Sequence, residues 1–189
     1  TPTNGIYGFL TILQRLLDEE RPDGICVAFD LRAPTFRHKQ YELYKAQRKG
    51  MPEDLAVQMP ILKQVLDAMG IVRVEKEGFE ADDIIGTVCR SADVHGDIMS
   101  YILTGDRDSL QLITDTTNVI LMRNHEDELF DNGHFFDTYG ITPSRFVDVK
   151  ALMGDSSDCI PGVAGIGEKT ALKLISAAGS LDGLYAAAE

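Results

Sequence analysis

The chain has 189 residues, 44% of them hydrophobic, which is enough to bury a core and fits one domain of ordinary size or one with an appendage. Its formal net charge of −12 at pH 7 argues against a uniformly basic nucleic-acid-binding surface, unless much of the acid is concentrated at one site. The sequence shows neither a signal-peptide pattern nor an apolar run approaching the ~18 residues of a membrane span, so we expect a soluble, cytoplasmic protein that does not bind membranes.

Short β-branched runs alternate with helical patterns along the first part of the chain. The runs predict buried strands at 25–29, 71–74, 99–103 and 118–122. Apolar residues at three- and four-residue spacing predict helices at 6–17, 53–70 and 80–92. This alternation is typical of an α/β fold with a parallel sheet flanked by helices.

After about residue 140 the strand patterns stop. Residues 146–154 and 168–179 predict two helices, and a loop rich in Gly, Ser, Asp and Pro connects them. We therefore expect an α/β core over 1–140 and a helix-loop-helix region over 141–189.

Carboxylates directly follow two of the predicted strands. Asp30 follows the strand at 25–29, and Asp106 and Asp108 follow the strand at 99–103. Because ligands of parallel sheets collect beyond the carboxyl ends of the strands, we expect both groups at the same edge. With the segments FEADDIIG and MGDSSDCIPG, the acidic candidates are Asp30, Glu80, Asp82, Asp83, Asp106, Asp108, Asp155 and Asp158.

Each acidic segment also has a purely structural interpretation. FEADD is typical of a helix start, GDRD of a solvated turn and GDSSD of an Asx-rich loop. Together, however, eight carboxylates without nearby bases favour hard divalent cations with oxygen ligands. Two such ions ~4 Å apart clamp the attacking and leaving oxygens of a phosphodiester displacement. The acidic set therefore predicts Mg²⁺-dependent phosphate chemistry.

A basic stripe follows Asp30. On a helix, Arg37, Tyr41, Tyr44, Lys45 and Arg48 share one face, where bases hold phosphates and a tyrosine stacks on a base. The alternative is a surface helix with packed tyrosines and solvated bases.

A glycine-rich turn precedes the last predicted helix. Gly162, Gly165 and Gly167 allow backbone N–H groups to face an anion at the helix N-terminus. The turn is not a Walker A loop, because Glu168 stands where the lysine belongs. Binding of the DNA backbone, independent of base sequence, fits the glycine-rich turn better.

Four ordered motifs carry a resemblance through essentially the whole chain: FDLRAPTFRHKQYELYKAQR, EGFEADDIIGT, LTGDRDSLQL and ALMGDSSDCIPGVAGIGEKTA. They resemble the 5′-3′ exonuclease domains of bacterial DNA polymerases I, within the flap endonuclease superfamily. The resemblance implies a PIN-like α/β domain, a helical arch at about 34–60 and a helix-loop-helix (H3TH) region. It also implies structure-specific cleavage of 5′ flaps and of nicked or gapped DNA, in Okazaki fragment processing and repair.

The resemblance also implies roles for particular residues. The eight carboxylates above match the positions that bind two or more Mg²⁺ or Mn²⁺ ions, and a K⁺ ion is implied at the helix-loop-helix. Catalytic arch positions correspond to Arg37, Lys45 and Arg48. DNA-contacting positions correspond to Tyr44, Gly162, Gly165, Gly167, Lys169 and Thr170. A polymerase domain in the same full-length chain, a monomeric state and a place on the bacterial nucleoid are also expected.

Two departures from the family pattern stand out. The family begins with a strand that ends in a metal-binding aspartate, and this chain starts after it, so we expect a fragment whose own activity the sequence does not give. Cys159 stands where asparagine is expected. The scattered Cys26, Cys89 and Cys159 and the four histidines argue against a disulfide framework or a zinc site.

Three other functions stay open at this stage. ILTGDRDS also resembles the strand-DxD signature of haloacid dehalogenase-type phosphatases, in which an aspartate is the nucleophile. A non-catalytic module that binds DNA structures is the second hypothesis. A PIN-type ribonuclease is the third, although such enzymes usually lack the arch and the glycine turn.

Overall fold

The computed structural model describes residues 2–123 and 127–188, which form two compact units. The first unit contains the residues up to Phe36 together with Arg48–Ile84. The second contains Arg37–Gln47 together with the residues from Ile85 onward. The division at residue 140 expected from the sequence stays a prediction.

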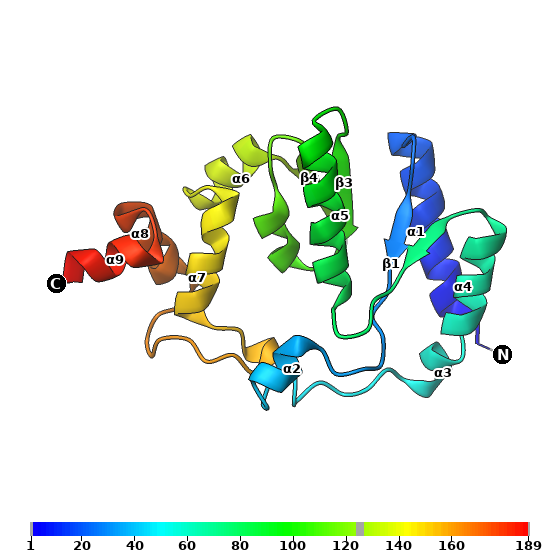
Figure 1. Ribbon diagram of the computed structural model, residues 1–189, viewed down its shortest axis with the longest axis horizontal. Helices are drawn as coiled ribbons and strands as arrows, with labels where there is room; N and C mark the ends of the chain where they lie inside the picture. The colour runs from blue at the N-terminus through cyan, green and yellow to red at the C-terminus, as the bar shows by residue number, and fades with distance from the viewer. Residues whose placement is uncertain (1, 124–126, 189) are drawn as a thin grey trace. The chain divides into compact units, whose positions relative to one another are not determined.

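The first unit is a parallel strand pair with two main helices. Its elements are α1 (Asn4–Glu20), β1 (Cys26–Ala28), α3 (Glu53–Ala56), α4 (Met59–Ala68) and β2 (Val72–Val74). β1 and β2 are parallel, with Cys26 opposite Val72 and Ala28 opposite Val74. The apolar faces of α1 and α4 meet β1 (Figure 1) in a small core built on Leu13, Phe29, Leu62, Leu66 and Ile71.

The helix expected over 53–70 is interrupted at Val57 and Gln58, between α3 and α4. Pro60 has no N–H to donate to the carbonyl of Ala56, so one continuous helix is disfavoured there. The side chain of Gln58, 1% exposed, instead caps α1. Its Oε1 accepts hydrogen bonds from the backbone N–H groups of Gly5 and Ile6 at 2.8 and 3.2 Å.

The second unit contains a three-stranded mixed sheet and most of the helices. Its strands are β3 (Ser100–Thr104), β4 (Thr117–Leu121) and β5 (Glu128–Phe130). β3 runs parallel to β4 with Ser100 opposite Thr117, and β5 pairs antiparallel to β4. α5 (Ala81–His95) has its first turn in the first unit and the remainder in the second.

Among the described residues, five further α-helices and three short 3-10 helices precede, follow or connect these strands. The α-helices are α2 (Phe36–Gln40) before the sheet, then α6 (Asn132–Tyr139), α7 (Phe146–Met153), α8 (Glu168–Ala178) and α9 (Leu181–Ala188). The 3-10 helices are η1 (Arg107–Leu112), η2 (Pro143–Arg145) and η3 (Ser156–Asp158).

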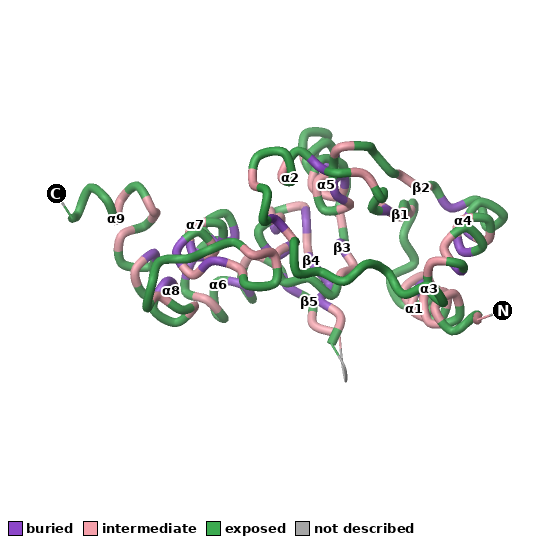
Figure 2. The backbone as a smooth tube through the Cα atoms, turned by 90° about the horizontal axis from the view of Figure 1, so that it is seen from below, coloured by how far each residue is buried: buried purple, intermediate pink, exposed green. Residues whose placement is uncertain are grey.

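One hydrophobic core joins the sheet of the second unit to the C-terminal helices. The side chains of Val119, Phe130, Phe135, Val149 and Ala171 are completely buried in it. The buried segments therefore run from β4 and β5 through α6 and α7 to α8 (Figure 2). This continuous packing fixes the loops after β3 and α7 relative to each other.

The α/β fold, the four predicted strands and the two C-terminal helices are confirmed, with two corrections to the sheet. Among the described residues β1–β2 and β3–β4–β5 are separate sheets rather than one. β5 is antiparallel and was not predicted, because three residues are too few to show a strand period. None of the helices within 2–123 and 127–188 is long and apolar enough to cross a bilayer.

Asp93, in the last turn of α5, provides a pH-dependent test of the second unit. Its Oδ1 accepts hydrogen bonds from the hydroxyls of Thr114, Thr116 and Thr117 at 3.1, 2.5 and 3.0 Å. These bonds, led by that of Thr116, lower the pKa of Asp93 despite burial. A lowered carboxyl pKa contributes stability that is present above the unfolded value of about 3.9 and is lost as the pH falls.

We therefore expect Asp93→Asn to reduce the free energy of unfolding at pH 6, and the difference from wild type to shrink below about pH 4. Urea unfolding between pH 6 and pH 3 measures this difference. The exposed Asp97→Asn is the control and should leave stability unchanged at every pH. A difference for Asp93→Asn that is constant with pH would contradict the assignment.

Candidate metal and nucleic-acid site

The loop after β3 fixes the two aspartates of the GDRD segment by local hydrogen bonds. The backbone N–H of Asp106 donates to Thr104 Oγ1 at 3.0 Å. Asp106 is the N-cap of η1, and its Oδ1 accepts from the N–H of Asp108 at 2.9 Å. The structural interpretation as a turn is therefore correct, and it places both carboxylates at the carboxyl end of β3.

The loop after α7 is fixed by the same kind of cap. Asp155 is the N-cap of η3, and its Oδ1 accepts from the backbone N–H and the hydroxyl of Ser157 at 2.8 and 2.6 Å. Gly154, with φ 72°, turns the chain out of α7. A Cβ on Gly154 would lie 2.3 Å from the backbone N of Gly162, so the two chain segments can approach only as glycines.

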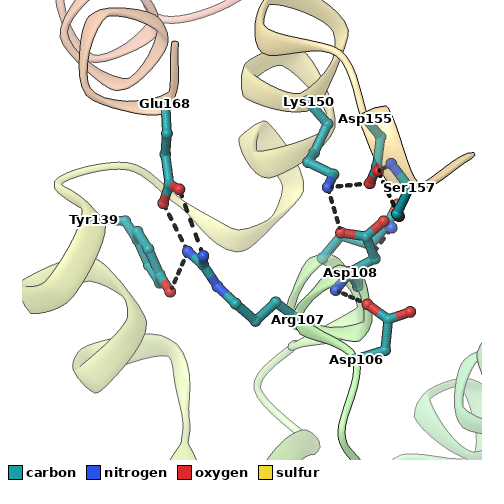
Figure 3. A network of polar contacts seen from close by, with 9 residues as sticks. Asp106, Arg107, Asp108, Tyr139, Lys150, Asp155, Ser157 and Glu168 are labelled. Atoms are coloured by element: carbon teal, nitrogen blue, oxygen red, sulfur yellow. Dashed lines mark hydrogen bonds and ion pairs between the residues drawn. The ribbon is translucent and has the colours of Figure 1, made fainter. Parts of the chain in front are cut away.

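Lys150 joins these two loops (Figure 3). Its Nζ lies 2.8 Å from Asp108 Oδ1 and 2.8 Å from Asp155 Oδ2. Burial would lower the pKa of Lys150, but the hydrogen bonds to Asp108 and Asp155 outweigh burial and raise it. Burial would likewise raise the pKa of Asp155, but hydrogen bonds from Lys150 and Ser157 lower it to about 2.

One ammonium does not neutralise this group of carboxylates. Burial raises the pKa of Asp108 in spite of the bond from Lys150, and the charges of Asp106 and Asp155 act in the same direction as burial. Three carboxylates and one ammonium leave an excess of negative charge, which stabilises a further or more highly charged cation.

Arg107 connects the same loop to the start of α8. Its guanidinium donates to Glu168 Oε1 at 2.6 Å and to the hydroxyl of Tyr139 at 3.2 Å, as Figure 3 shows. The bond to Glu168 is the main reason that the pKa of Arg107 is raised. Arg107 and Glu168 line a hollow of about 240 Å³ together with Asp106, Asp108, Lys150 and Asp155. The acidic loop and the first turn of α8 therefore open onto one cavity.

The acidic residues of the first unit gather at the N-terminus of α5. Asp30 Oδ1 accepts from the N–H of Ala81 at 2.7 Å, and Asp83 Oδ2 accepts from the N–H of Glu80 at 2.9 Å. The capping interpretation of FEADD is thus correct. Glu80 is 8% exposed, and Asp82 lies in the first turn.

The structure thus holds two acidic groups, one in each compact unit. Asp30, Glu80, Asp82 and Asp83 belong to the first, whereas Asp106, Asp108, Asp155 and Asp158 belong to the second. Over the described ranges 2–123 and 127–188, no three His, Cys, Asp or Glu side chains form a ready-made metal-binding cluster. In the second group, two of the carboxylates already share the Lys150 ammonium.

The prediction of a continuous helical stripe over 37–48 is wrong. α2 ends at Gln40, and turns follow to Gln47. Contacts far away in sequence override the helix: the hydroxyl of Tyr41 donates to the carbonyl of Cys159 at 3.1 Å, and the N–H of Lys45 donates to the carbonyl of Asp158 at 3.0 Å. Tyr44 is 6% exposed, and Lys45 has φ 55°.

The helix that would place these residues on one face is therefore absent. Arg37 and Lys45 lie in the second unit and Arg48 in the first, where it is exposed. Lys45 Nζ lies 5.0 Å from the centre of the Tyr44 ring. Residues 37–47 are thus attached to the 155–160 loop through backbone and hydroxyl hydrogen bonds.

The glycines of the glycine-rich turn before α8 differ in what surrounds them. Gly162 is packed tightly, since a Cβ there would lie 2.3 Å from the carbonyl carbon of Met153. Gly165, with φ 80°, and Gly167, the N-cap of α8, have open space where a Cβ would point. Lys169 and Thr170 are exposed in the first turn of α8.

Sequence reasoning did not single out Lys150, Arg107 or Tyr139. Lys150 is five residues before Asp155, a spacing that carries no motif, and its role depends on a bend at Gly154. Arg107 stands inside the GDRD segment, but its partner Glu168 is 61 residues away.

The fold and both parts of the chain match a single family. Residues 1–140 match the model of the 5′-3′ exonuclease N-terminal resolvase-like domain, and residues 141–189 match that of the 5′-3′ exonuclease C-terminal SAM fold. The chain therefore belongs to the 5′-3′ exonuclease family, which confirms the resemblance carried by the four motifs. The haloacid dehalogenase hypothesis loses its support.

Bacterial DNA polymerases I are among the curated relatives of the chain. The chain is 45% identical over 184 residues to DNA polymerase I of Bacillus subtilis, covering 96% of the chain and 21% of that protein. It is 44% identical over 183 residues to the thermostable DNA polymerase I of Thermus filiformis, covering 97% of the chain and 21% of that protein. The chain thus spans about a fifth of the length of the curated relatives it matches.

Solved structures show the same fold at lower identity. The T5 D15 protein co-crystallised with metal ions superposes with a TM-score of 0.78 at 21% identity, covering 97% of this chain and 71% of that one. T5 5′-exonuclease with bound zinc superposes with a TM-score of 0.76 at 20% identity, covering 99% of this chain and 77% of that one. The catalytic core of Rad2 in complex with a DNA substrate superposes with a TM-score of 0.61 at 20% identity, covering 97% of this chain and 56% of that one.

Cys159 gives a stability test of the 155–160 loop. It adopts φ 59° and ψ 26°, the left-handed region that asparagine tolerates better than other residues with a Cβ. The strain explains why asparagine is the expected residue at this position. We expect Cys159→Asn to raise the free energy of unfolding by up to about 1 kcal/mol, measured by urea unfolding without metal. Cys159→Val should lower it, and equal stability of the two variants would contradict the strained loop.

Proposed function

We propose that this chain is the nuclease region of a bacterial DNA polymerase I, and that it hydrolyses phosphodiester bonds at 5′ ends and 5′ flaps of DNA with divalent cations. The observation that carries the proposal is the excess negative charge of Asp106, Asp108 and Asp155, which line one hollow in a 5′-3′ exonuclease fold. Asp108 and Asp155 share a single ammonium there. Its biological place would be Okazaki fragment processing and DNA repair.

The donor chemistry of the second unit fits a hard divalent cation. All three side chains are carboxylates, the ligand type that Mg²⁺ and Mn²⁺ prefer, and Asp108 and Asp155 already bind a positive charge at one point. T5 proteins of the same fold were solved with metal ions and with zinc. We propose Mg²⁺, or Mn²⁺, as the working ion here.

A second ion would be held by the acidic residues at the N-terminus of α5. Glu80, Asp82 and Asp83, with Asp30, supply the carboxylates for it, and Asp158 lies with the second-unit group. Divalent ions at such sites supply an activated water and offset the charge that develops on the phosphate. The protein's own part is to hold the carboxylates in place through the caps of α5, η1 and η3.

The bases after Asp30 are proposed to contact the DNA near the scissile phosphate. Arg37, Lys45 and Arg48 would offset negative charge there. The burial of Tyr44 and its position under the Lys45 ammonium suit a supporting role for this ring, in the conformation described, better than stacking on a base.

The first turn of α8 is proposed to bind the DNA backbone. The exposed Gly165, Gly167, Lys169 and Thr170 would face a phosphate, while the packing of Gly162 against Met153 shapes the turn. A K⁺ ion in this turn is a further part of the proposal. T5 flap endonuclease and Rad2, with the same fold, were solved with DNA.

The wider biological setting is also part of the proposal. The polymerase domain would follow in the same full-length chain, as the named relatives suggest. The protein would act as a monomer on the nucleoid, in the bacterial cytoplasm.

The decisive test is the cleavage of end-labelled 5′-flap DNA by the full-length protein with and without Mg²⁺. We expect Asp108→Asn to reduce turnover by at least about 10²-fold, because metal-bound charge is needed most in the transition state, and to leave flap binding within about tenfold. The exposed Asp137→Asn is the control and should retain normal turnover. Flap binding without cleavage in the wild type under any divalent ion would favour the non-catalytic module.

A substitution at Gly167 tests DNA binding without an expected loss of stability. Its φ is −96° and a Cβ meets nothing within 4 Å, so Gly167→Val should stay folded. We expect weaker binding to duplexes of any sequence and a KM that rises more than kcat falls, because a backbone contact is equal in ground and transition states. Fluorescence anisotropy on two unrelated duplexes measures the binding.

Gly24→Val, at another glycine with open space, is the matched control and should bind DNA normally. Gly162→Val is expected to unfold the turn instead, as circular dichroism would show. Normal affinity of folded Gly167→Val would remove the first turn of α8 from the DNA interface.

A further inference from the structure

The ammonium of Lys150 is the only cation that the structure shows bound to both Asp108 and Asp155 within residues 2–123 and 127–188. Both distances are 2.8 Å, the length of a charge-assisted hydrogen bond. The two bonds start from one nitrogen on α7 and reach the GDRD loop and the 155–160 loop (Figure 3). Lys150 therefore stands where the two acidic loops converge.

We propose that Lys150 is an internal cation, which takes one divalent-ion position in the metal-free protein and is displaced when the ion binds. This inference rests on the proposed metal-dependent function. It assigns to Lys150 a positioning role, because it acts through Asp108 and Asp155 and not on the DNA.

Geometry and charge disfavour binding of the Lys150 ammonium and a divalent ion to Asp108 and Asp155 at the same time. Mg²⁺ binds carboxylate oxygens at about 2.1 Å, so an ion between Asp108 and Asp155 needs the space near the ammonium. Two cations held by the same oxygens also repel each other. The Lys150 side chain can move its ammonium into solvent, since it has four flexible carbons and is 25% exposed.

Two consequences follow for the metal site. Without metal, the Lys150 bonds hold the carboxylates of separate loops together, so the site is arranged before an ion arrives. With metal present, the ion binds only the fraction of molecules in which Lys150 has left, and its apparent affinity falls by that fraction. Lys150 therefore lowers the affinity of the site for metal, and in return it keeps the Asp108 and Asp155 carboxylates in place in the metal-free protein.

The test is Mn²⁺ binding to the full-length protein by isothermal titration calorimetry. Asp108→Asn/Asp155→Asn serves as the background, because it removes this site and leaves any other Mn²⁺ site in the chain. Lys150→Met keeps the apolar stem and removes the charge. We expect it to bind Mn²⁺ at the site about tenfold more tightly than wild type, and to have a lower Tm in EDTA than wild type.

Two control variants separate displacement from a general change in charge. Lys173→Met removes an exposed lysine of α8 and should change Mn²⁺ affinity by less than about twofold. Lys150→Arg keeps a competing cation and should bind Mn²⁺ as weakly as wild type. If Lys150→Met does not fold, Lys150→Gln, which also removes the charge, is measured in its place with the same expected gain in Mn²⁺ affinity.

The outcomes distinguish the inference from the proposed function. If wild type and Lys150→Met bind Mn²⁺ with equal affinity above the background, Lys150 does not compete and the inference fails alone. If Lys150→Arg binds much more tightly than wild type, charge competition also fails. If no variant binds more Mn²⁺ than the background, both the inference and the metal site of the proposed function fail.

Discussion

The convergence of carboxylates from separate loops is the constraint on which the second unit depends. Asp106 and Asp108 leave β3 side by side, and Asp155 reaches the same cavity from the loop after α7. Like charges at this distance repel unless a cation lies among them. Lys150 supplies one positive charge, while the nearby Arg107 pairs with Glu168. This excess of negative charge is the reason we propose that a divalent ion replaces Lys150 at the site.

The same carboxylates shape the backbone that carries them. Asp106 and Asp155 each cap a 3-10 helix with one oxygen, and Asp30 and Asp83 cap α5. A capping bond fixes the rotamer of the side chain, so its second oxygen points in a defined direction. The structural and functional interpretations of the acidic motifs are therefore compatible, because one carboxylate serves the helix start and still offers an oxygen to a cation.

The sequence predicted what depends on local pattern and missed what depends on distant contacts. The strands, the helices and the acidic loops follow from hydrophobic period and turn chemistry, and the structure contains them. The stripe over 37–48 failed because Tyr41 and Lys45 bond to the 155–160 loop, which no local pattern indicates. Lys150 was missed for the same reason. The single sheet was an extrapolation from alternation, which predicts parallel pairing but not which strands are neighbours.

The location of the divalent ion tests this account most directly. Crystals of the full-length protein grown with Mn²⁺ would be measured at the manganese absorption edge, where anomalous scattering identifies the ion. We predict a manganese peak within bonding distance of carboxylate oxygens of Asp108 and Asp155, with Lys150 Nζ moved away from both. Lys150 still bridging these carboxylates, with no manganese bound to either of them, would contradict the account.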